Sequence, residues 1–175
     1  TWQRTFDINV MGVVHGCRAF LPAMVERSKT SGASASVVNV ASAAGLSAMA
    51  DMPVYASSKF AVVGLSESLR ADLRRHRINV TCLCPGLINT PIVKNTRYEG
   101  ARMSSDAARE RIQQVYHRRN YTPRRVAEVL VRAVERRAGL VPVTPESWFI
   151  WWAQRISPGL LSRVTANGER LLARR

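Results

Sequence analysis

The chain has 175 residues, 46% of them hydrophobic, which is enough for one domain with a buried core. It contains no uninterrupted run of about 18 apolar residues and does not open with the basic and apolar segments of a signal peptide, so we expect neither a membrane-spanning helix nor a leader. The net charge of +14 comes mainly from arginine. It favours either an anionic partner (nucleic acid, a membrane surface or a phosphorylated cofactor) or an arginine-rich solvated surface. No nucleic-acid-binding motif accompanies it, so we expect no nucleic acid partner.

The first expected element is a helix from Trp2 to Arg27, where apolar residues recur at helical spacing. Pro22 lies inside this pattern and predicts a kink or a local break. Asn9, a mediocre helix former, also lies inside it. Because the helical pattern is already under way at Thr1 and no initiator Met is present, we expect an upstream segment in the natural protein.

A loop of small polar residues over 28–36 separates this helix from an apolar strand, Val37–Ala41, which ends just before Ser42. Open α/β sheets bind their ligands at the carboxyl ends of strands, so the Ser42 hydroxyl is a candidate ligand-binding group. Three large apolar residues in the next loop either line a substrate pocket or pack in the core. They are Leu46, Met49 and Met52.

Tyr55 and Lys59 are four residues apart on the next helix, so their side chains lie on one face. A phenol has an ordinary pKa of about 10, and a neighbouring ammonium group lowers it by favouring the phenolate. A tyrosine tuned in this way can exchange a proton with an alcohol or carbonyl oxygen. Together with Ser42, the pair predicts a proton-transfer site.

The helix that carries this pair is expected over Val54–His76, with unusually small side chains in its first half. A strand with alternating pattern, Ile78–Cys84, follows and ends at Pro85-Gly86. Strand, helix and strand in this order predict a right-handed parallel crossover. Cys82 and Cys84 are two apart in the strand, a poor geometry for a disulfide or a zinc pair. With Cys17 they are expected to be buried free thiols, and no metal site is predicted.

Residues 92–122 are polar and basic, with an expected helix over Ser104–Arg118 that Ser104-Ser105-Asp106 would cap. Because this segment follows the carboxyl end of a strand, it lies where a lid over a site would be. A further helix begins at Thr122-Pro123 and ends at Gly139, and a short strand follows over Leu140–Val143.

We expect a domain over residues 1–143 and a separate helical tail over 144–175. The tail starts with a helix that carries Trp148, Phe149, Ile150, Trp151 and Trp152. A second short helix is expected from Pro158, with arginines toward the end of the chain. The aromatic cluster indicates either contact with a membrane surface, or a gate for a lipid-like substrate, or packing on the body of the protein or across a subunit interface.

Five sequence elements in this order resemble the short-chain dehydrogenase/reductase family over about residues 1–143. They are Asn9 in N-V-M-G, Ser42 in N-V-A-S-A-A-G, Tyr55 and Lys59 in Y-A-S-S-K, and Pro85-Gly86 in P-G-L-I-N-T. The resemblance implies an α/β fold with a doubly wound parallel sheet (Rossmann-like), incomplete at its N-terminus, and an oxidoreductase that uses NAD or NADP. Its substrate would be a small alcohol or ketone, hydrophobic or even lipid-like.

The resemblance also implies a role for each residue. Tyr55 would be the general acid/base, and Lys59 would lower its pKa and hold the nicotinamide ribose. Ser42 would bind the substrate oxygen, and Asn9 would hold a water that links Lys59 to solvent. The loop that packs on the nicotinamide would be formed by Pro85, Gly86, Ile88 and Thr90.

The chain departs from the family in a large part of the cofactor site, because the glycine-rich turn T-G-x-x-x-G-x-G that cradles the pyrophosphate is absent. The acidic or basic residue that chooses NAD over NADP and the N-N-A-G segment are absent as well. We therefore expect the chain to be the C-terminal part of a member, with little dehydrogenase activity if it were the whole polypeptide. The alternative is an inactive remnant or binding scaffold of the same fold. The family also leads us to expect a homo-oligomer paired through the two long helices. We further expect a cytoplasmic location, either free or in contact with a membrane surface through the C-terminal tail.

Overall fold

The computed structural model describes residues 1–48, 52–92 and 106–159. A long N-terminal helix is formed by α1 (Trp2–Phe6), a π-helical turn η1 (Asp7–Met11) and α2 (Gly12–Ser31). Strand β1 (Ala35–Val40) and a 3-10 turn η2 (Ala43–Gly45) follow. The remaining elements, in chain order, are α3 (Pro53–Leu73), η3 (Arg74–His76), β2 (Ile78–Cys84), α5 (Asp106–Arg119), α6 (Pro123–Glu135), β3 (Leu140–Pro142) and α7 (Pro145–Ile156).

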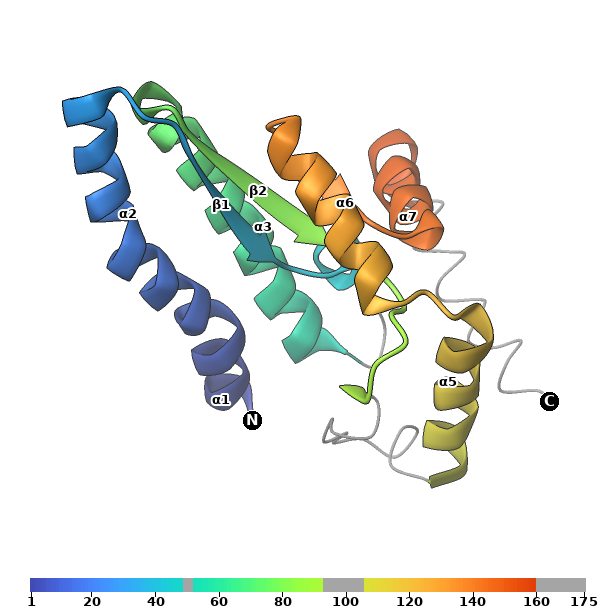
Figure 1. Cartoon of the computed structure of the whole chain (residues 1–175). Coiled ribbons are helices and arrows are strands. Elements are labelled where there is room, and N and C mark those ends of the chain that lie inside the picture. Colours follow the sequence, from blue (N-terminus) through green and yellow to red (C-terminus); the bar gives the residue numbers. More distant parts are fainter. Residues whose placement is uncertain (49–51, 93–105, 160–175) are drawn as a thin grey trace.

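The described strands form one parallel sheet in the order β1-β2-β3. Ala35 of β1 pairs with Ile78 of β2, and Cys82 of β2 pairs with Leu140 of β3. Helices α2 and α3 cover one face of the sheet, and α6 lies across the other (Figure 1). The expected α/β class with a doubly wound parallel sheet is therefore confirmed.

Two hydrophobic clusters fill the space between the sheet and helices α2 and α3. The cluster at the amino ends of the strands is built on Leu73, Ile78 and Val80, with large side chains of α2 packed against it. The cluster at the carboxyl ends uses smaller residues, Ala41, Cys82 and Cys84, around Leu46 and Val62. Alternate residues of β2 supply both clusters because side chains in a strand alternate between faces.

The N-terminal helix differs from its predicted form in two ways. Its irregular turn is the π-helical segment Asp7–Met11, and Pro22 lies inside α2 without the local break that is one of the two predicted outcomes. The helix also continues to Ser31 rather than Arg27, and it ends where Gly32 adopts a left-handed conformation with φ 66°. The glycine is suited to that position because it has no Cβ to clash.

Taken by length and composition, the helical stretch Trp2–Ser31 meets the test for a membrane span, with a mean hydropathy of 1.3 in its most apolar window. This finding differs from the expectation of no such helix. Core helices of folded domains pass the same test when they are mostly buried, whereas the apolar window of this helix is 0% buried in the described structure. Val10, Val13 and Leu21 of the helix pack against the two core clusters.

The second half of the chain follows its predicted order. Helix α6 begins at Pro123, and the Thr122 hydroxyl caps it by accepting the Arg125 N–H at 3.4 Å. It ends at Glu135, one turn before Gly139, because Arg137 takes up the left-handed conformation there. The expected Ser104-Ser105 cap, the contact of Met49 and the helix beyond Gly159 lie outside the described residues.

Candidate active site

The carboxyl ends of β1 and β2 lie next to each other and carry the first two parts of the predicted site. Ser42 follows β1, and Pro85-Gly86 follows β2. The two chains stay paired beyond the strands, since the Ala41 N–H donates to Leu83 O and the Ala43 N–H to Pro85 O, both at 2.8 Å. The structure therefore brings Ser42 beside the predicted cofactor loop.

Ser42 is half-buried and begins the short turn η2. Its backbone is extended, and its Oγ accepts the Ala44 N–H at 3.2 Å. Because that hydrogen bond uses the hydroxyl as an acceptor, its proton remains available to donate to a substrate oxygen. Gly45 lets this turn pack on α3: a Cβ there would lie 2.7 Å from Lys59 O.

Lys59 projects from α3 toward the end of β1. Its Nζ donates to Val40 O at 3.3 Å and lies 5.7 Å from the centroid of the Tyr55 ring. Burial lowers the pKa of Lys59, and the nearby thiols of Cys82 and Cys84 act in the opposite direction. The ammonium group is thus close to the phenol, as the four-residue spacing predicts.

Asn9 lies in the π-helical turn and reaches the same helix one residue before Lys59. Its Nδ2 donates to Ser58 Oγ at 3.0 Å, and Ser58 Oγ donates in turn to Tyr55 O at 2.7 Å. Ser58 is fully buried. The contact holds the N-terminal helix against the backbone of the turn that carries Tyr55, and π-helical turns often occur at functional sites. The predicted water relay through Asn9 stays a prediction.

The loop after β2 is held in place by Thr144 and Glu146, which the sequence does not mark as site residues. Gly86 has no room for a side chain, because a Cβ would collide with Thr144 Oγ1 and the Glu146 carboxylate. Glu146 Oε1 accepts the Leu87 N–H at 2.9 Å, and the same carboxylate forms an ion pair with Arg119 of α5. The only local sequence signal for Glu146 is its position in the first turn of a helix, where a negative charge interacts favourably with the helix dipole.

The end of the loop contacts the segment between α5 and α6. The Asn89 N–H donates to Tyr121 O at 2.8 Å, while the Thr90 hydroxyl donates to Ile88 O at 3.4 Å. Ile88 and Thr90 are both half-buried. The predicted cofactor loop is therefore held at both ends, by Glu146 near its start and by Tyr121 near its end.

Leu46 is one of the three loop residues expected either to line a substrate pocket or to pack in the core. Leu46 is buried in the carboxyl-end cluster with Val62 and Cys82, so it packs in the core instead of lining a pocket. The three thiols are also as expected. All are free and buried, and Cys82 Sγ lies 4.0 Å from Cys84 Sγ.

Comparisons with known proteins agree with this architecture. A short chain dehydrogenase family model matches residues 1–101. The probable oxidoreductase EphD of Mycobacterium tuberculosis is 34% identical over 169 residues, which cover 95% of this chain and 28% of EphD. A short-chain dehydrogenase/reductase from Burkholderia phymatum in complex with NAD superposes with a TM-score of 0.74 at 29% identity, over 91% of this chain and 59% of that one.

A second solved structure extends the likeness in fold alone. It is a short chain dehydrogenase from Burkholderia cenocepacia in complex with NADP, with a TM-score of 0.73 at 21% identity over 94% of this chain and 59% of that one. The chain therefore spans less than two thirds of the length of these relatives. Because the family model covers more than half of its residues, the chain belongs to the short-chain dehydrogenase family.

Proposed function

We propose that this chain carries the catalytic part of an NAD- or NADP-dependent oxidoreductase that interconverts an alcohol and a ketone. The observation that carries the proposal is the position of the Lys59 ammonium group, which is bonded to the end of β1 and lies 5.7 Å from the Tyr55 ring centroid. Ser42 begins the turn directly after that strand. The relative EphD, described as a probable oxidoreductase, and the solved dehydrogenase that holds NAD support the same class. The similar fold of a dehydrogenase that holds NADP agrees with it.

The residues present fit the nicotinamide end of such a cofactor. A lysine ammonium has three N–H donors, and Val40 O accepts from Lys59 Nζ, which leaves donors for the ribose hydroxyls. The loop from Pro85 to Thr90 lies beside Ser42 and would face the nicotinamide ring. When bound, the cofactor gives or accepts the hydride at the carbon of the substrate.

Side chains of the protein, and not the cofactor, transfer the proton. In the reducing direction Tyr55 donates its phenolic proton to the substrate oxygen, and Ser42 stabilises the developing charge with a hydrogen bond. In the oxidising direction Tyr55 accepts the alcohol proton. Lys59 favours the phenolate in both directions because its positive charge lowers the pKa of a nearby phenol. Asn9 positions the Tyr55 turn through Ser58.

The test is turnover of the natural polypeptide that contains these residues, measured as NAD(P)H absorbance with a panel of hydrophobic ketones. Tyr55→Phe is expected to lower kcat by about 10²- to 10⁴-fold, the usual contribution of a general acid/base. Tyr116→Phe is the matched control: it removes a phenol of α5 that is not among the residues of the candidate site, and it is expected to change kcat only slightly. Full activity of Tyr55→Phe would contradict the role of Tyr55 as general acid/base, and absence of turnover by the wild type with every ketone would favour the alternative, an inactive remnant or scaffold.

We also propose that the aromatic helix α7 contacts a membrane surface. Its outer side chains, Trp148, Phe149, Trp152 and Ile156, are between 44% and 77% exposed. Trp151 differs, because it packs against the carboxyl-end cluster with Arg155 4.1 Å above its ring. Aromatic side chains beside basic ones are typical of helices that lie at a lipid interface. A cytoplasmic protein with peripheral membrane contact, acting on a lipid-like substrate, would agree with this surface.

Co-sedimentation with anionic liposomes tests this contact. Trp148→Ala/Trp152→Ala is expected to abolish sedimentation, whereas Trp151→Ala mainly destabilises the core. If the outer pair sediments as the wild type does, the exposed face has another use, such as a subunit interface.

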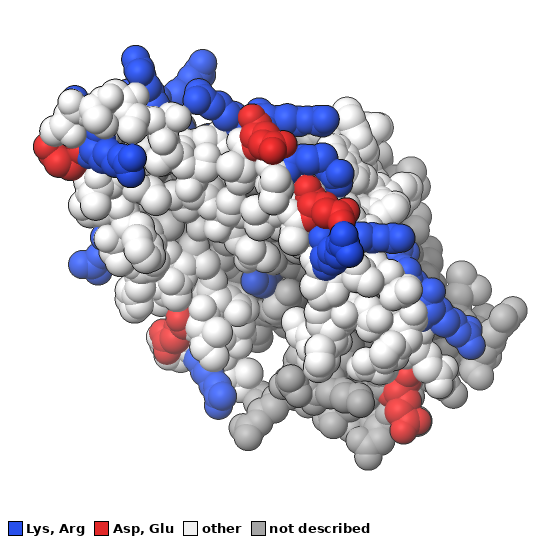
Figure 2. Space-filling model, in the orientation of Figure 1, with Lys and Arg blue, Asp and Glu red and all other residues white. Residues whose placement is uncertain are grey.

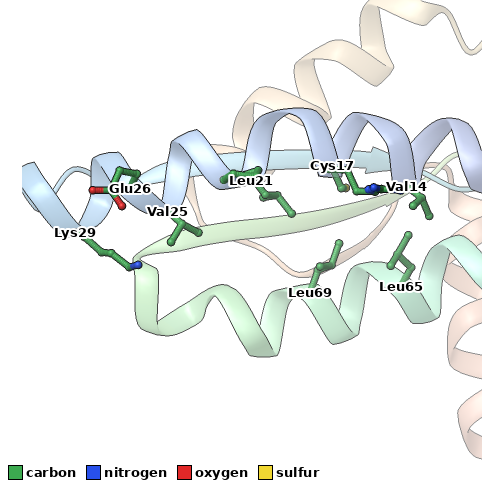
Figure 3. Close-up of a pocket in the computed structure, with 10 residues that line it drawn as sticks. Val14, Cys17, Leu21, Val25, Glu26, Lys29, Leu65 and Leu69 are labelled. Atoms are coloured by element: carbon green, nitrogen blue, oxygen red, sulfur yellow. The ribbon is translucent and has the colours of Figure 1, made fainter.

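A homo-oligomer paired through α2 and α3 is a further proposal. Side chains of the two helices point toward each other across a groove of about 670 Å³ lined by Leu21, Val25, Leu65 and Leu69 among others (Figure 3). Gly16 and Gly64 have no described atom within 4 Å of the position that a Cβ would occupy, so their surfaces stay open to a second copy. Sedimentation equilibrium of Gly64→Glu against the wild type tests this pairing, with a monomeric variant expected.

A further inference from the structure

At the end of the sheet opposite the candidate active site, the structure contains a second cavity, of about 340 Å³. Its size falls within the range of about 300–1,000 Å³ typical of small-ligand sites. It lies where β2 begins, close to the ends of α3 and α6. Its lining residues are Arg70, Arg74, Arg77, Ile78, Asn79 and Arg137. Four of the six are arginines, and none is acidic.

The arginines of this cavity are fixed by backbone carbonyls rather than by carboxylates. Arg70 Nη1 donates to Asn79 Oδ1 at 2.5 Å, to Val80 O at 3.0 Å and to Ala138 O at 3.2 Å, and its Nη2 donates to Arg137 O at 2.9 Å. Arg77 Nη1 donates to Gly32 O at 3.1 Å. Gly139 makes room for Arg70, since a Cβ there would lie 2.9 Å from its Nε. Two of the four side chains are thus held in place before any ligand binds.

The positive charge of the cavity is not neutralised by the protein. Among the residues that the structure describes, none of the four arginines forms an ion pair with an acidic side chain. The ends of α3 and α6 supply partial negative charge, about half a charge each, which is less than four full charges. Figure 2 shows Lys and Arg side chains along the upper edge of the molecule, the side at which the strands begin in Figure 1.

Two of these arginines occupy backbone conformations that favour glycine. Arg77 has φ 55° and Arg137 has φ 52°, and both follow the end of a helix. At such positions a residue with a Cβ is strained, and glycine is the usual choice. The fold therefore holds two arginine side chains at the rim of one cavity at some cost in stability.

We propose that this cavity is a binding site for a phosphate-bearing ligand, a small soluble phosphate monoester or pyrophosphate. Guanidinium groups suit it because their planar sets of N–H donors match phosphate oxygens, and an anion relieves the repulsion among the four positive charges. The held side chain of Arg77 reduces the entropy lost on binding, and Arg70 contributes mainly charge because its Nη1 already donates to three protein acceptors. The site lies at the amino ends of the strands, so it is separate from the proposed cofactor site and does not depend on oxidoreductase activity.

The experiment is isothermal titration calorimetry of the full 175-residue chain with inorganic phosphate and with pyrophosphate. We expect saturable binding to the wild type that weakens steeply with added salt. Arg137→Gly and Arg74→Gln are each expected to weaken it about tenfold or more, the effect of losing a hydrogen bond between charged groups. Arg132→Gln removes the same charge from the exposed face of α6 outside the cavity and is expected to leave affinity within about twofold.

Thermal unfolding separates a binding role of Arg137 from a structural one, because loss of a structural contact would lower Tm. Because glycine relieves the strain at a left-handed position, Arg137→Gly is expected to raise Tm by a few degrees while it weakens pyrophosphate binding. Absence of saturable binding to the wild type would overturn the proposal, and so would equal losses in Arg137→Gly and Arg132→Gln. Binding only to phosphate groups of anionic vesicles, with none to the soluble anions, would identify a lipid surface as the source of the phosphate and overturn the soluble ligand.

Discussion

The two ends of the sheet are built on different principles. At the amino ends, bulky aliphatic side chains such as Ile78 and Val80 fill the core, and guanidinium groups cover it. At the carboxyl ends, the buried residues are mostly small, including Ala43, Ala44 and Gly45, and a single lysine reaches in among them. Small residues let backbone segments approach closely, so the carboxyl end fixes main-chain positions, whereas the amino end stabilises the fold through buried apolar area.

This difference agrees with the position proposed for the catalytic groups. The side chains of the candidate site start from backbone that is tightly held, by Gly45 against Lys59 and by Gly86 against Glu146. A catalytic group must be positioned to within a fraction of an ångström, and a closely packed backbone provides that precision.

The largest expected effect tests the contrast in core composition. Ile78→Ala at the amino end removes a buried aliphatic side chain and is expected to lower the free energy of unfolding by about 2–5 kcal/mol. Cys84→Ala at the carboxyl end removes only a buried sulfur, and a loss of about 1 kcal/mol is expected. Urea denaturation followed by circular dichroism measures both. Equal losses would contradict the proposed division between the two ends.

The tight backbone of the carboxyl end is tested by adding one methyl group. Gly86→Ala is expected to cost about 1–3 kcal/mol of unfolding free energy, because the new Cβ meets Thr144 and Glu146. Gly64→Ala is the control on α3, measured at a protein concentration at which the chain is monomeric, because no described atom of the same chain lies within 4 Å of the added Cβ. It is expected to stabilise the protein by about 0.5–1 kcal/mol, since alanine is the better helix former. A neutral Gly86→Ala would show that the loop can move away.

The next prediction concerns the contacts of Glu146 that hold the loop after β2 in place. Glu146→Ala leaves the Leu87 N–H without its acceptor and is expected to cost about 1–3 kcal/mol. Glu146→Gln keeps an acceptor oxygen and loses only the partly exposed ion pair with Arg119, worth at most about 1 kcal/mol. Chemical denaturation of both variants separates the two contributions. If Gln costs as much as Ala, the ion pair and not the backbone contact holds the loop.

The smallest effect is the pH dependence due to Lys59. Burial lowers its pKa from 10.5, so between the folded value and 10.5 the unfolded chain binds more protons than the folded chain. Stability is then expected to rise with pH across that alkaline window because of Lys59. Lys59→Met removes this contribution, and its denaturation midpoint should vary less with pH there. An unchanged pH profile would mean that the ammonium group is well solvated in the folded protein.

Local patterns in the sequence predict the elements well, and contacts between distant residues account for what they miss. Alternation in I-N-V-T-C-L-C gives the bounds of β2, and Thr122-Pro123 gives the start of α6. The sequence pattern places the end of α2 four residues early, because its last serines and threonine suggest a loop. In the structure the hydroxyls of Thr30 and Ser31 bond back to Glu26 O and Arg27 O within the helix.

The candidate site also contains some residues that local patterns predict and others that they miss. The spacing of Tyr55 and Lys59 can be interpreted from the sequence because both lie on one helical face. Glu146 cannot be selected, because its partners Leu87 and Arg119 are 59 and 27 residues away and no local pattern links them. The left-handed backbone conformation of the two arginines is equally unpredictable from the sequence. Nothing in the residues around Arg137 indicates a conformation that glycine normally adopts.

The π-helical turn at Asp7–Met11 has a consequence for insertions and deletions in this helix. Such a turn completes one revolution with one residue more than an α-helical turn, so it absorbs the extra residue locally. Removing one residue from this segment is expected to restore a regular helix without rotating the residues before it. Trp2 and Phe6 would keep their direction, whereas Asn9, which lies inside the turn, would be displaced from Ser58. The length of this segment, and not only its composition, is therefore expected to be under constraint.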